Sequence, residues 1–303
     1  MWKTVTLLIF TLLVVPVMTV YMDVAPDDTQ WALLKSTYTV CLVFIGLVFI
    51  VSAITGNYSQ VDKLWSILPV VYAWMAYVQV PGPRVVLIAV LITLWGVRLT
   101  LNFARRGGYS LKIWSGEEDY RWSILRAKPE FQAPWKWILF NLFFISFYQM
   151  SLIWMMTVPI VRTANTGSLG LADYILAALA VGLLIMETVA DQQQWDFQKE
   201  KYRLKDEGKL SGTKYEKGFA HEGLWGLSRH PNYFAEQSFW VVIYLFSVAA
   251  TGTWANWSIA GCLLLVLLFK GSSDFSEKIS AEKYPEYEEY QKKVPRFIPF
   301  TKF

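Results

Sequence analysis

Polar residues of the kind that bind ligands are concentrated between positions 223 and 236, in the segment GLWGLSRHPNYFAE. Arg229 and His230 come just before its proline, which prevents a regular helix from running through residue 230. We therefore expect a helix to begin near Asn232, with its free N–H groups and positive dipole end beside the two preceding side chains. Glu236 lies one turn further along the same face. The pattern predicts a site that holds a phosphate at the helix start and hydrogen-bonds a polar group below it.

A second polar face is predicted directly after the apolar segment that ends near residue 190. If its helix continues, one face carries residues spaced by four, three and four positions: Asp191, Trp195, Gln198 and Tyr202. These side chains offer a carboxylate, an indole, an amide and a phenol in succession, and Arg203 follows them. Such a face suits an extended polar ligand such as a nucleotide, because a solvated helix extension would carry mixed charge with fewer aromatic and amide groups.

Three polar residues of the earlier apolar segments leave two interpretations open. Arg98 lies about two turns inside its segment, where a guanidinium needs a partner: a ligand phosphate, or an ion pair with Asp62 or Glu187. Asp62 is either a solvated carboxylate at a helix N-terminus or a proton-handling group at the mouth of the bundle. Tyr148 hydrogen-bonds either a substrate or a neighbouring helix.

The elements that position these residues are transmembrane helices. The chain has 303 residues, 54% of them hydrophobic and 17% aromatic, with a mean hydropathy of +0.33, which is too apolar for a soluble domain. With ~20 apolar residues needed for one crossing, we expect eight spans. They lie at about 2–22, 33–55, 64–80, 84–104, 136–160, 170–190, 233–251 and 255–271. The fold class is an all-α, polytopic membrane bundle, and the tail at 274–293 is expected to form a cytoplasmic amphipathic helix.

The distribution of basic residues predicts the topology. Loop 105–136 holds seven Lys or Arg residues and loop 191–232 holds eight, whereas the alternate loops carry only Arg84 and Arg162. Because basic loops face the cytoplasm, we expect both termini to be cytoplasmic. Arg105 and Arg106 lie at the membrane boundary, where snorkelling explains them without a ligand. The membrane would be the endoplasmic reticulum in a eukaryote and the inner membrane in a bacterium.

Composition argues against several other classes of protein. The net charge of +4 is small and no nucleic-acid-binding module is visible, so no nucleic-acid partner is expected. Cys41 and Cys262 both lie in apolar runs, which argues against a disulfide framework or a thiolate site. His221 and His230 are the only histidines, so no metal is expected either.

The segment 223–236, the two apolar segments after it and the ending PRFIP at 295–299 resemble the C-terminal region of the steroid 5-alpha-reductase superfamily, and more narrowly its DUF1295 family. VDKLW at 61–65, LWGVRL at 94–99, EDYRW at 118–122 and the run 191–197 are also similar to that family. The resemblance covers about 57–299. It implies a single membrane domain over 1–303, in which 57–303 is the reductase-like core and 1–56 forms peripheral helices.

The resemblance further implies that NADPH is held between the cytoplasmic loops and the bundle and reduces an activated carbon–carbon double bond. The expected substrate is a small hydrophobic molecule, such as a steroid, sterol or isoprenoid, that enters from the lipid. Pattern and resemblance together give these cofactor-binding residues: Arg98, Arg105, Arg106, Asp191, Tyr202, Arg203, Arg229, His230, Asn232, Tyr233, Glu236 and Lys270.

One departure from the steroid reductases concerns the catalytic acid. Those enzymes polarise the substrate ketone with a Glu and a Tyr, where this chain has Ile67 (or Asp62, with a gap) and Trp95. An indole N–H is a hydrogen-bond donor only and cannot serve as a general acid. A 3-ketosteroid substrate is therefore not expected, and Asp62 and Tyr148 are the candidate catalytic residues, with Tyr72 as a further candidate.

Two other functions compete with the reductase. Isoprenylcysteine carboxyl methyltransferases also carry an Arg-His-Pro-x-Tyr turn before a helical hairpin, and there the resemblance implies S-adenosylmethionine as cofactor. NADPH needs several cations for its phosphates and S-adenosylmethionine needs none, so the basic residues favour the reductase. The third hypothesis is a non-catalytic lipid-binding protein, which would bind no nucleotide.

Overall fold

The structure is a computed structural model that describes residues 2–110 and 118–301. Within these ranges every regular element is a helix and no strand occurs. The chain divides into two compact units: a first unit, Met1–Ala177 with Val242–Leu264, and a second unit, Ala178–Val241 with Leu265–Phe303. The unit boundaries fall inside three of the long helices. The prediction of one membrane domain with a core at 57–303 stays a prediction.

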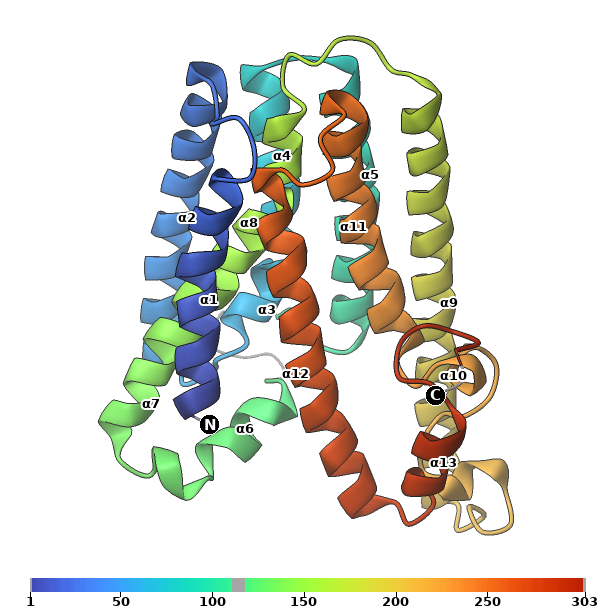
Figure 1. Cartoon of the computed structure of the whole chain (residues 1–303). Coiled ribbons are helices and arrows are strands. Elements are labelled where there is room, and N and C mark those ends of the chain that lie inside the picture. Colours follow the sequence, from blue (N-terminus) through green and yellow to red (C-terminus); the bar gives the residue numbers. More distant parts are fainter. Residues whose placement is uncertain (1, 111–117, 302–303) are drawn as a thin grey trace. The chain divides into compact units, whose positions relative to one another are not determined.

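The first unit holds most of the helices in the N-terminal half (Figure 1). These are α1 (Trp2–Val20), α2 (Asp28–Thr55), α3 (Gln60–Trp65), α4 (Leu68–Gln79), α5 (Pro83–Arg105), α6 (Tyr120–Arg126), α7 (Pro134–Phe140) and α8 (Gln149–Arg162). The unit also contains the short elements η1 (Pro129–Phe131), η2 (Asn141–Tyr148) and η4 (Trp257–Ile259), and parts of the three long helices that the boundaries divide. Helix α2 packs against α8 and η2, and α4 packs against α5 and α8.

The second unit is built on parts of three long helices: α9 (Leu171–Asp206), α11 (Pro231–Thr251) and α12 (Ala260–Lys283). Between and after them lie η3 (Lys214–Lys217), α10 (Leu224–Leu227) and α13 (Tyr287–Lys293). Phe219, Tyr287 and Tyr290 form a small buried aromatic cluster beside which Tyr284 packs. Burial raises the pKa of Tyr287 to about 12, so its phenol is neutral.

Six helical segments of the described chain are long and apolar enough to cross a membrane, where eight were predicted. They are Asp28–Thr55, Pro83–Arg105, Pro134–Arg162, Leu171–Asp206, Pro231–Thr251 and Trp257–Lys283. The predicted spans at 2–22 and 64–80 do form helices, but the apolar part of the first is only Thr6–Val20 and α4 has only 12 residues. The composition of these helices indicates an integral membrane protein.

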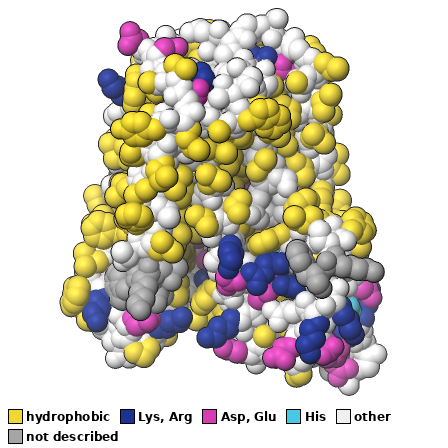
Figure 2. Space-filling model, in the orientation of Figure 1, with side chains coloured by type: hydrophobic (Ala, Val, Ile, Leu, Met, Phe, Trp, Pro, Cys, Tyr) yellow, Lys and Arg dark blue, Asp and Glu magenta, His cyan; other side chains and the backbone are white. Residues whose placement is uncertain are grey.

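Side-chain types are segregated along the helices. Figure 2 shows that hydrophobic side chains cover the middle stretches of the visible face, whereas Lys, Arg, Asp and Glu gather at helix ends. One charged pair is buried instead: Arg84 at the start of α5 bonds both carboxylate oxygens of Asp173, with Nε–Oδ1 at 2.7 Å. Its remaining N–H groups donate to Thr166 and to the carbonyl of Ser168. The guanidinium therefore has a structural role: it joins the start of α5 to the segment 166–173.

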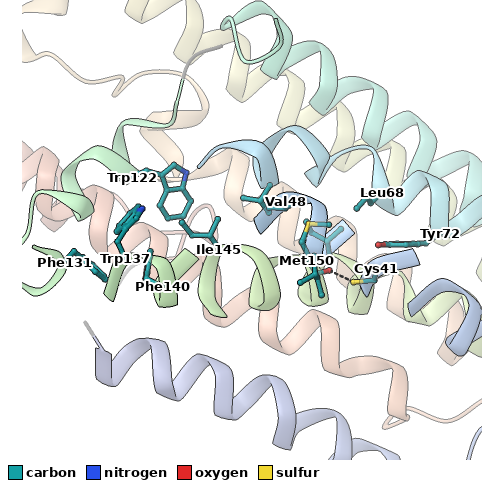
Figure 3. Packing of buried hydrophobic residues seen from close by; sticks show 13 residues of the cluster. Cys41, Val48, Leu68, Tyr72, Trp122, Phe131, Trp137, Phe140, Ile145 and Met150 are labelled. Atoms are coloured by element: carbon teal, nitrogen blue, oxygen red, sulfur yellow. Dashed lines mark hydrogen bonds between the residues drawn. The ribbon is translucent and has the colours of Figure 1, made fainter. Parts of the chain in front are cut away.

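The core of the first unit is a cluster of aromatic and aliphatic side chains (Figure 3). Aromatic rings pack in series within it: the ring centroids of Trp137 and Phe140 are 5.3 Å apart, and those of Phe140 and Phe144 are 5.0 Å apart. Further along the core, the thiol of Cys41 donates to the carbonyl of Met150 at 3.4 Å, which joins α2 to α8. These contacts fix the segment η2, on which Tyr148 lies, against the core of the first unit.

Candidate functional site

The predicted helix start in the segment 223–236 is confirmed. Helix α11 begins at Pro231, and Ser228 before it has an extended backbone (φ −149°, ψ 143°). The first helical bond runs from the N–H of Phe234 to the carbonyl of His230 at 3.0 Å. A proline is well placed as the first helical residue because it has no N–H to leave unpaired.

Arg229, which was predicted to hold a phosphate, is occupied by groups of the second unit itself. Its Nε donates to Oε1 of Glu277 at 2.8 Å and its Nη2 donates to Oε2 at 3.2 Å. Its Nη1 donates to the carbonyls of Gln291 and Val294. The guanidinium therefore joins the turn before α11 to α12 through a two-point ion pair and to the C-terminal segment through two carbonyl bonds.

His230 faces the same carboxylate. Its Nε2 lies 2.9 Å from Oε1 of Glu277, and its ring stacks on Tyr233 with centroids 5.1 Å apart. Gln291 donates from Nε2 to Oε2 of Glu277 at 2.9 Å. Arg296 also donates from Nη2 to Oε2 at 3.4 Å. The Glu277 side chain is only 3% exposed, so four side chains satisfy its carboxylate in a nearly dry setting.

Backbone bonds hold the C-terminal segment against the same turn. The N–H groups of Arg229 and His230 donate to the carbonyls of Pro295 and Arg296 at 2.9 and 3.0 Å. The Ser228 hydroxyl also donates to the carbonyl of Arg296. These bonds, with the Glu277 contacts, show that the Arg-His pair serves as a fastening point for residues 291–296.

The sequence predicted a polar face on α9 and another at the start of α11, and the structure brings the two faces together next to the Arg229 turn. Nδ2 of Asn232 on α11 donates to Oδ1 of Asp191 on α9 at 3.1 Å. Oδ1 of Asn232 accepts from the N–H of Tyr233 at 3.0 Å. Asp191 is 5% exposed and Glu236 is 4% exposed, and Glu236 accepts a bond from Nε1 of Trp240 at 3.2 Å. We call Asp191, Asn232 and Glu236 the polar wall of the second unit.

The remaining predicted residues of the second unit lie on its surface. Tyr202 is 51% exposed. Arg203 pairs with Glu200 and Glu207, each at 2.6 Å, with half of its side chain exposed. Lys270 pairs with Asp274 at 2.8 Å and its side chain is 63% exposed. The predicted face from Asp191 to Tyr202 is thus buried at its first residue and solvated at its last.

In the first unit, Asp62 on α3 is partly buried and contacts a residue of α6. Oδ2 of Asp62 accepts from Nε1 of Trp122 at 3.3 Å. Burial, and after it the charge of Asp119, raise the pKa of Asp62. Burial alone would also raise the pKa of Asp119, but its hydrogen bonds and charge contact with Arg121 outweigh burial and lower that pKa. Two neighbouring carboxyls thus have opposite preferences, since Asp62 favours its neutral form and Asp119 its charged form.

The other predicted residues of the first unit differ in burial. Arg105 and Arg106 are exposed at the end of α5, and Nε of Arg105 donates to Oδ1 of Asn102 at 2.8 Å. Arg98 is partly buried two turns earlier. Tyr148 is fully buried, at the point where η2 gives way to α8.

Comparison with known proteins identifies the family. The family model described as "Protein of unknown function (DUF1295)" matches residues 48–294. The chain belongs to the DUF1295 family. It is also 38% identical over 267 residues to the uncharacterized protein C594.04c of Schizosaccharomyces pombe, covering 82% of this chain and 74% of that protein. No solved structure matches.

The polar wall of this DUF1295 protein fits some parts of a nucleotide better than others. The carboxylates and the amide can hydrogen-bond the ribose hydroxyls and the carboxamide of a nucleotide, since hydroxyls and carboxamides each donate and accept hydrogen bonds. Phosphates need cations, and four of the five N–H groups of the Arg229 guanidinium already donate to Glu277, Gln291 and Val294. In the described part of the chain, no group of three or more His, Cys, Asp or Glu side chains could hold a metal ion.

Sequence reasoning missed two carboxylates of the DUF1295 protein. Glu277 was not singled out; it lies less than two turns before the end of α12, in a polar stretch with Asp274 and Glu282 that follows the apolar part of the helix. Glu187 was considered only as a partner for Arg98, yet it is 4% exposed one turn before Asp191 on α9. The four-residue spacing to Asp191 was the available signal, because it places both acids on one helix face.

Proposed function

We propose that this DUF1295 protein is an integral membrane reductase that uses NADPH to reduce an activated carbon–carbon double bond in a lipidic substrate, such as a sterol or isoprenoid. The observation that carries the proposal is the 3.1 Å bond between Asn232 and Asp191. It joins the polar faces of two apolar helices at a depth where unused polar groups are costly.

When bound, NADPH supplies a hydride to one alkene carbon, and the other carbon takes a proton. The chain's own residues provide the setting for this transfer. Asn232 and Asp191 offer an amide and a carboxylate to the ribose and carboxamide of the cofactor, and the buried Glu236 lies one turn deeper. Hydride transfer needs a dry site with fixed geometry, and the apolar spans around the polar wall favour both conditions.

The phosphates would be bound by cations whose present bonds are weak. Arg203 and Lys270 form exposed ion pairs with Glu200, Glu207 and Asp274. Because exposed pairs contribute little to stability, such side chains can exchange a carboxylate for a phosphate. Arg229 is assigned a structural role instead, since its donors hold Glu277 and the C-terminal segment.

A second candidate function is an S-adenosylmethionine-dependent membrane methyltransferase. The observation that favours it is the engagement of Arg229, because a cofactor with no phosphate does not need that cation. The acidic character of the polar wall points the same way, since Asp191 and Glu236 would attract the positive charges of S-adenosylmethionine.

The molecule that copurifies with the protein separates these functions. The protein would be purified in mild detergent and its extract analysed by mass spectrometry. We expect NADP(H) in near-stoichiometric amount, and its loss from the Asn232→Ala variant. Thr251→Ala is the matched control, because that hydroxyl lies at the far end of α11, where it donates to the carbonyl of Ser247 and accepts from the N–H of Thr253. S-adenosylmethionine or its demethylated product would favour the methyltransferase, and no nucleotide at all would favour a lipid-binding protein.

A further inference from the structure

The polar end of α9 carries a buried lysine without an ion pair. Lys201 is 7% exposed, and its Nζ donates to the carbonyl of Gly218 at 3.1 Å. An ammonium group has three N–H donors, so this bond leaves two of them for other acceptors. In the described part of the chain no carboxylate forms an ion pair with Lys201. Lysines are almost never buried unless they are paired, so the position of this one needs a reason.

Two further lysines lie around the same point of the second unit. Lys205 follows Lys201 by four positions, which places both on one face of α9. Lys283 is the last residue of α12. Its Nζ lies 5.4 Å from the ring centroid of Tyr284, and Nζ of Lys201 lies 5.8 Å from the same centroid. The charges of Lys205 and Lys283 both act on the Lys201 ammonium. We call Lys201, Lys205 and Lys283 the lysine cluster.

Neighbouring lysines of the second unit have carboxylate partners. Lys214 pairs with Glu222 at 2.6 Å, and Lys217 pairs with Glu286 at 3.2 Å. Among the described residues, no member of the lysine cluster forms such a pair. The dipole at a helix C-terminus attracts cations, but only within the last turn, and Lys201 lies before it. Three like charges therefore repel one another without a counter-charge from the protein, which is a setting that favours a bound anion.

Aromatic rings hold the cluster in place. The ring of Tyr284 packs on Phe219 with centroids 5.9 Å apart. Gly218, at the end of η3, has a φ of 83°, and an added Cβ there would collide with the Tyr284 ring. On its other side, Nζ of Lys201 lies 4.8 Å from the ring centroid of Tyr202. The buried ammonium is thus positioned before any ligand binds, which reduces the entropy lost on binding.

The position of the cluster along α9 indicates where a ligand comes from. The apolar part of this helix ends near residue 190, and from there to Lys201 an α-helix rises about 16 Å. The headgroup layer adds only about 5–8 Å to each side of the hydrocarbon core. The cluster therefore lies in the aqueous phase, beyond the reach of an ordinary lipid headgroup.

From these observations we infer that the lysine cluster binds a terminal phosphate group of a soluble ligand, as in a phosphomonoester or a polyphosphate. Such a group carries about −1.5 to −2 charge at neutral pH and offers three strong acceptor oxygens, which match the ammonium charges and donors of the cluster. The site is separate from the polar wall and does not depend on the proposed function. Arg203, which is proposed to bind a cofactor phosphate, lies two positions after Lys201 and therefore on the opposite face of α9.

The first test is isothermal titration calorimetry with inorganic pyrophosphate on the purified protein in detergent. Lys205→Gln and Lys283→Gln should each weaken binding about tenfold, which is the usual strength of one hydrogen bond to a charged group. Both side chains are exposed, so the variants should fold. Lys278→Gln is the matched control: it removes the same charge from α12, but Lys278 pairs with Glu282 at 3.9 Å, and we expect wild-type affinity. No binding by the wild type, or equal weakening in the control, would overturn the assignment.

The buried member of the cluster is tested with Lys201→Met, which keeps an apolar stem and removes the charge. This variant should lose pyrophosphate binding, and melting curves establish that it is folded. A folded variant that binds pyrophosphate with wild-type affinity would contradict the assignment. If the variant does not fold, the exposed pair Lys205→Gln and Lys283→Gln decides the matter.

A second test separates a soluble ligand from a lipid headgroup. Wild type and Lys283→Gln would be placed in nanodiscs of phosphatidylcholine, with and without phosphatidic acid, whose headgroup is a phosphomonoester. We expect the ratio of their pyrophosphate Kd values to be the same in both membranes. The ratio cancels the general repulsion of pyrophosphate by anionic lipid, because both proteins experience it alike. A ratio that falls to one with phosphatidic acid would show that the headgroup fills the cluster, and the assignment to a soluble ligand would fail.

A third measurement separates the lysine cluster from the polar wall. Asn232→Ala should bind pyrophosphate as the wild type does, and Lys283→Gln should keep the full NADPH-induced rise in thermal midpoint. If NADPH does not stabilise the wild type while pyrophosphate binding depends on the lysines, the reductase fails and the anion site stands. If NADPH stabilises the wild type and Lys283→Gln loses that shift, the lysines hold a cofactor phosphate and the separate site is refuted.

Discussion

Arg229 and Glu277 form a two-point ion pair in the second unit, with Nε–Oε1 at 2.8 Å and Nη2–Oε2 at 3.2 Å. The two side chains are 10% and 3% exposed, so the pair is shielded from water. Arg229 also bonds the carbonyl of Gln291, and through these contacts α11, α12 and the C-terminal segment share one guanidinium. The most specific motif of the sequence therefore contains a fastening point beside its polar wall.

This pair predicts a large loss of stability on removal of one partner. Arg229→Leu leaves the Glu277 carboxylate buried without its main counter-charge, which should cost about 3 kcal/mol or more in the free energy of unfolding. Limited proteolysis should then cut first within residues 284–301, because the segment loses its attachment. The comparison is Arg203→Leu, whose ion pairs are exposed and whose removal should leave both the midpoint and the cleavage pattern unchanged. Equal behaviour of the two variants would refute the fastening role.

Two glycines in long helices predict opposite effects of one added methyl group. A Cβ on Gly261 would lie 2.3 Å from the carbonyl oxygen of Met155, so Gly261→Ala forces two helix backbones of the first unit apart and should lower the thermal midpoint. At Gly182 in α9 nothing lies within 4 Å of an added Cβ, so Gly182→Ala should stabilise the helix by about 0.5–1 kcal/mol. Detergent melting curves of the two variants check both signs, and a stabilising Gly261→Ala would show that the close approach is wrong.

The pKa of Asp62 predicts a dependence of stability on pH. Burial and the nearby Asp119 raise the pKa above its ordinary value of 3.8, so folding favours the neutral carboxyl. The stabilising contribution is complete below pH 3.8 and is lost as the pH rises through the raised value. Asp62→Asn should therefore match the wild type in acid and become the more stable protein as the pH rises.

Melting curves from acidic to neutral pH measure that difference. Asp119→Asn serves as the opposite case, because the pKa of Asp119 is lowered and its charged form stabilises the fold above its ordinary value. That variant should lose stability at neutral pH and approach the wild type in acid. A stability difference between Asp62→Asn and wild type that does not change with pH would show that the Asp62 carboxyl does not titrate as described.

The sequence was informative wherever a local pattern determines the structure. The proline at 231 predicted the start of α11, and apolar length predicted helices at every expected span. The count of eight spans is not confirmed: six described segments are long and apolar enough, and α4 has only 12 residues, because helix length depends on packing partners that a hydropathy pattern does not contain. The sequence also predicted that α9 continues beyond residue 190 as a polar helix, because the polar residues from Asp191 to Tyr202 keep a helical spacing.

The site was only partly predictable, because pairing across distant segments leaves no local signal. Asp191 and Asn232 were each singled out, but their bond joins residues 41 positions apart. Arg229 was interpreted as a phosphate ligand because its partner Glu277 lies 48 positions further along the chain. Charge type alone does not tell whether a cation is available to a ligand or already paired inside the fold.

The central claim is that the polar wall binds NADPH, and thermal stabilisation tests it most directly. Purified protein in detergent would be melted with no addition, with NADPH and with S-adenosylmethionine, each at saturating concentration. We predict that NADPH raises the midpoint by about 3 °C or more and exceeds the effect of S-adenosylmethionine. We also predict that Asn232→Ala and Glu236→Ala abolish the shift while Thr251→Ala retains it. A larger shift with S-adenosylmethionine, or an NADPH shift that persists in both wall variants, would contradict the account.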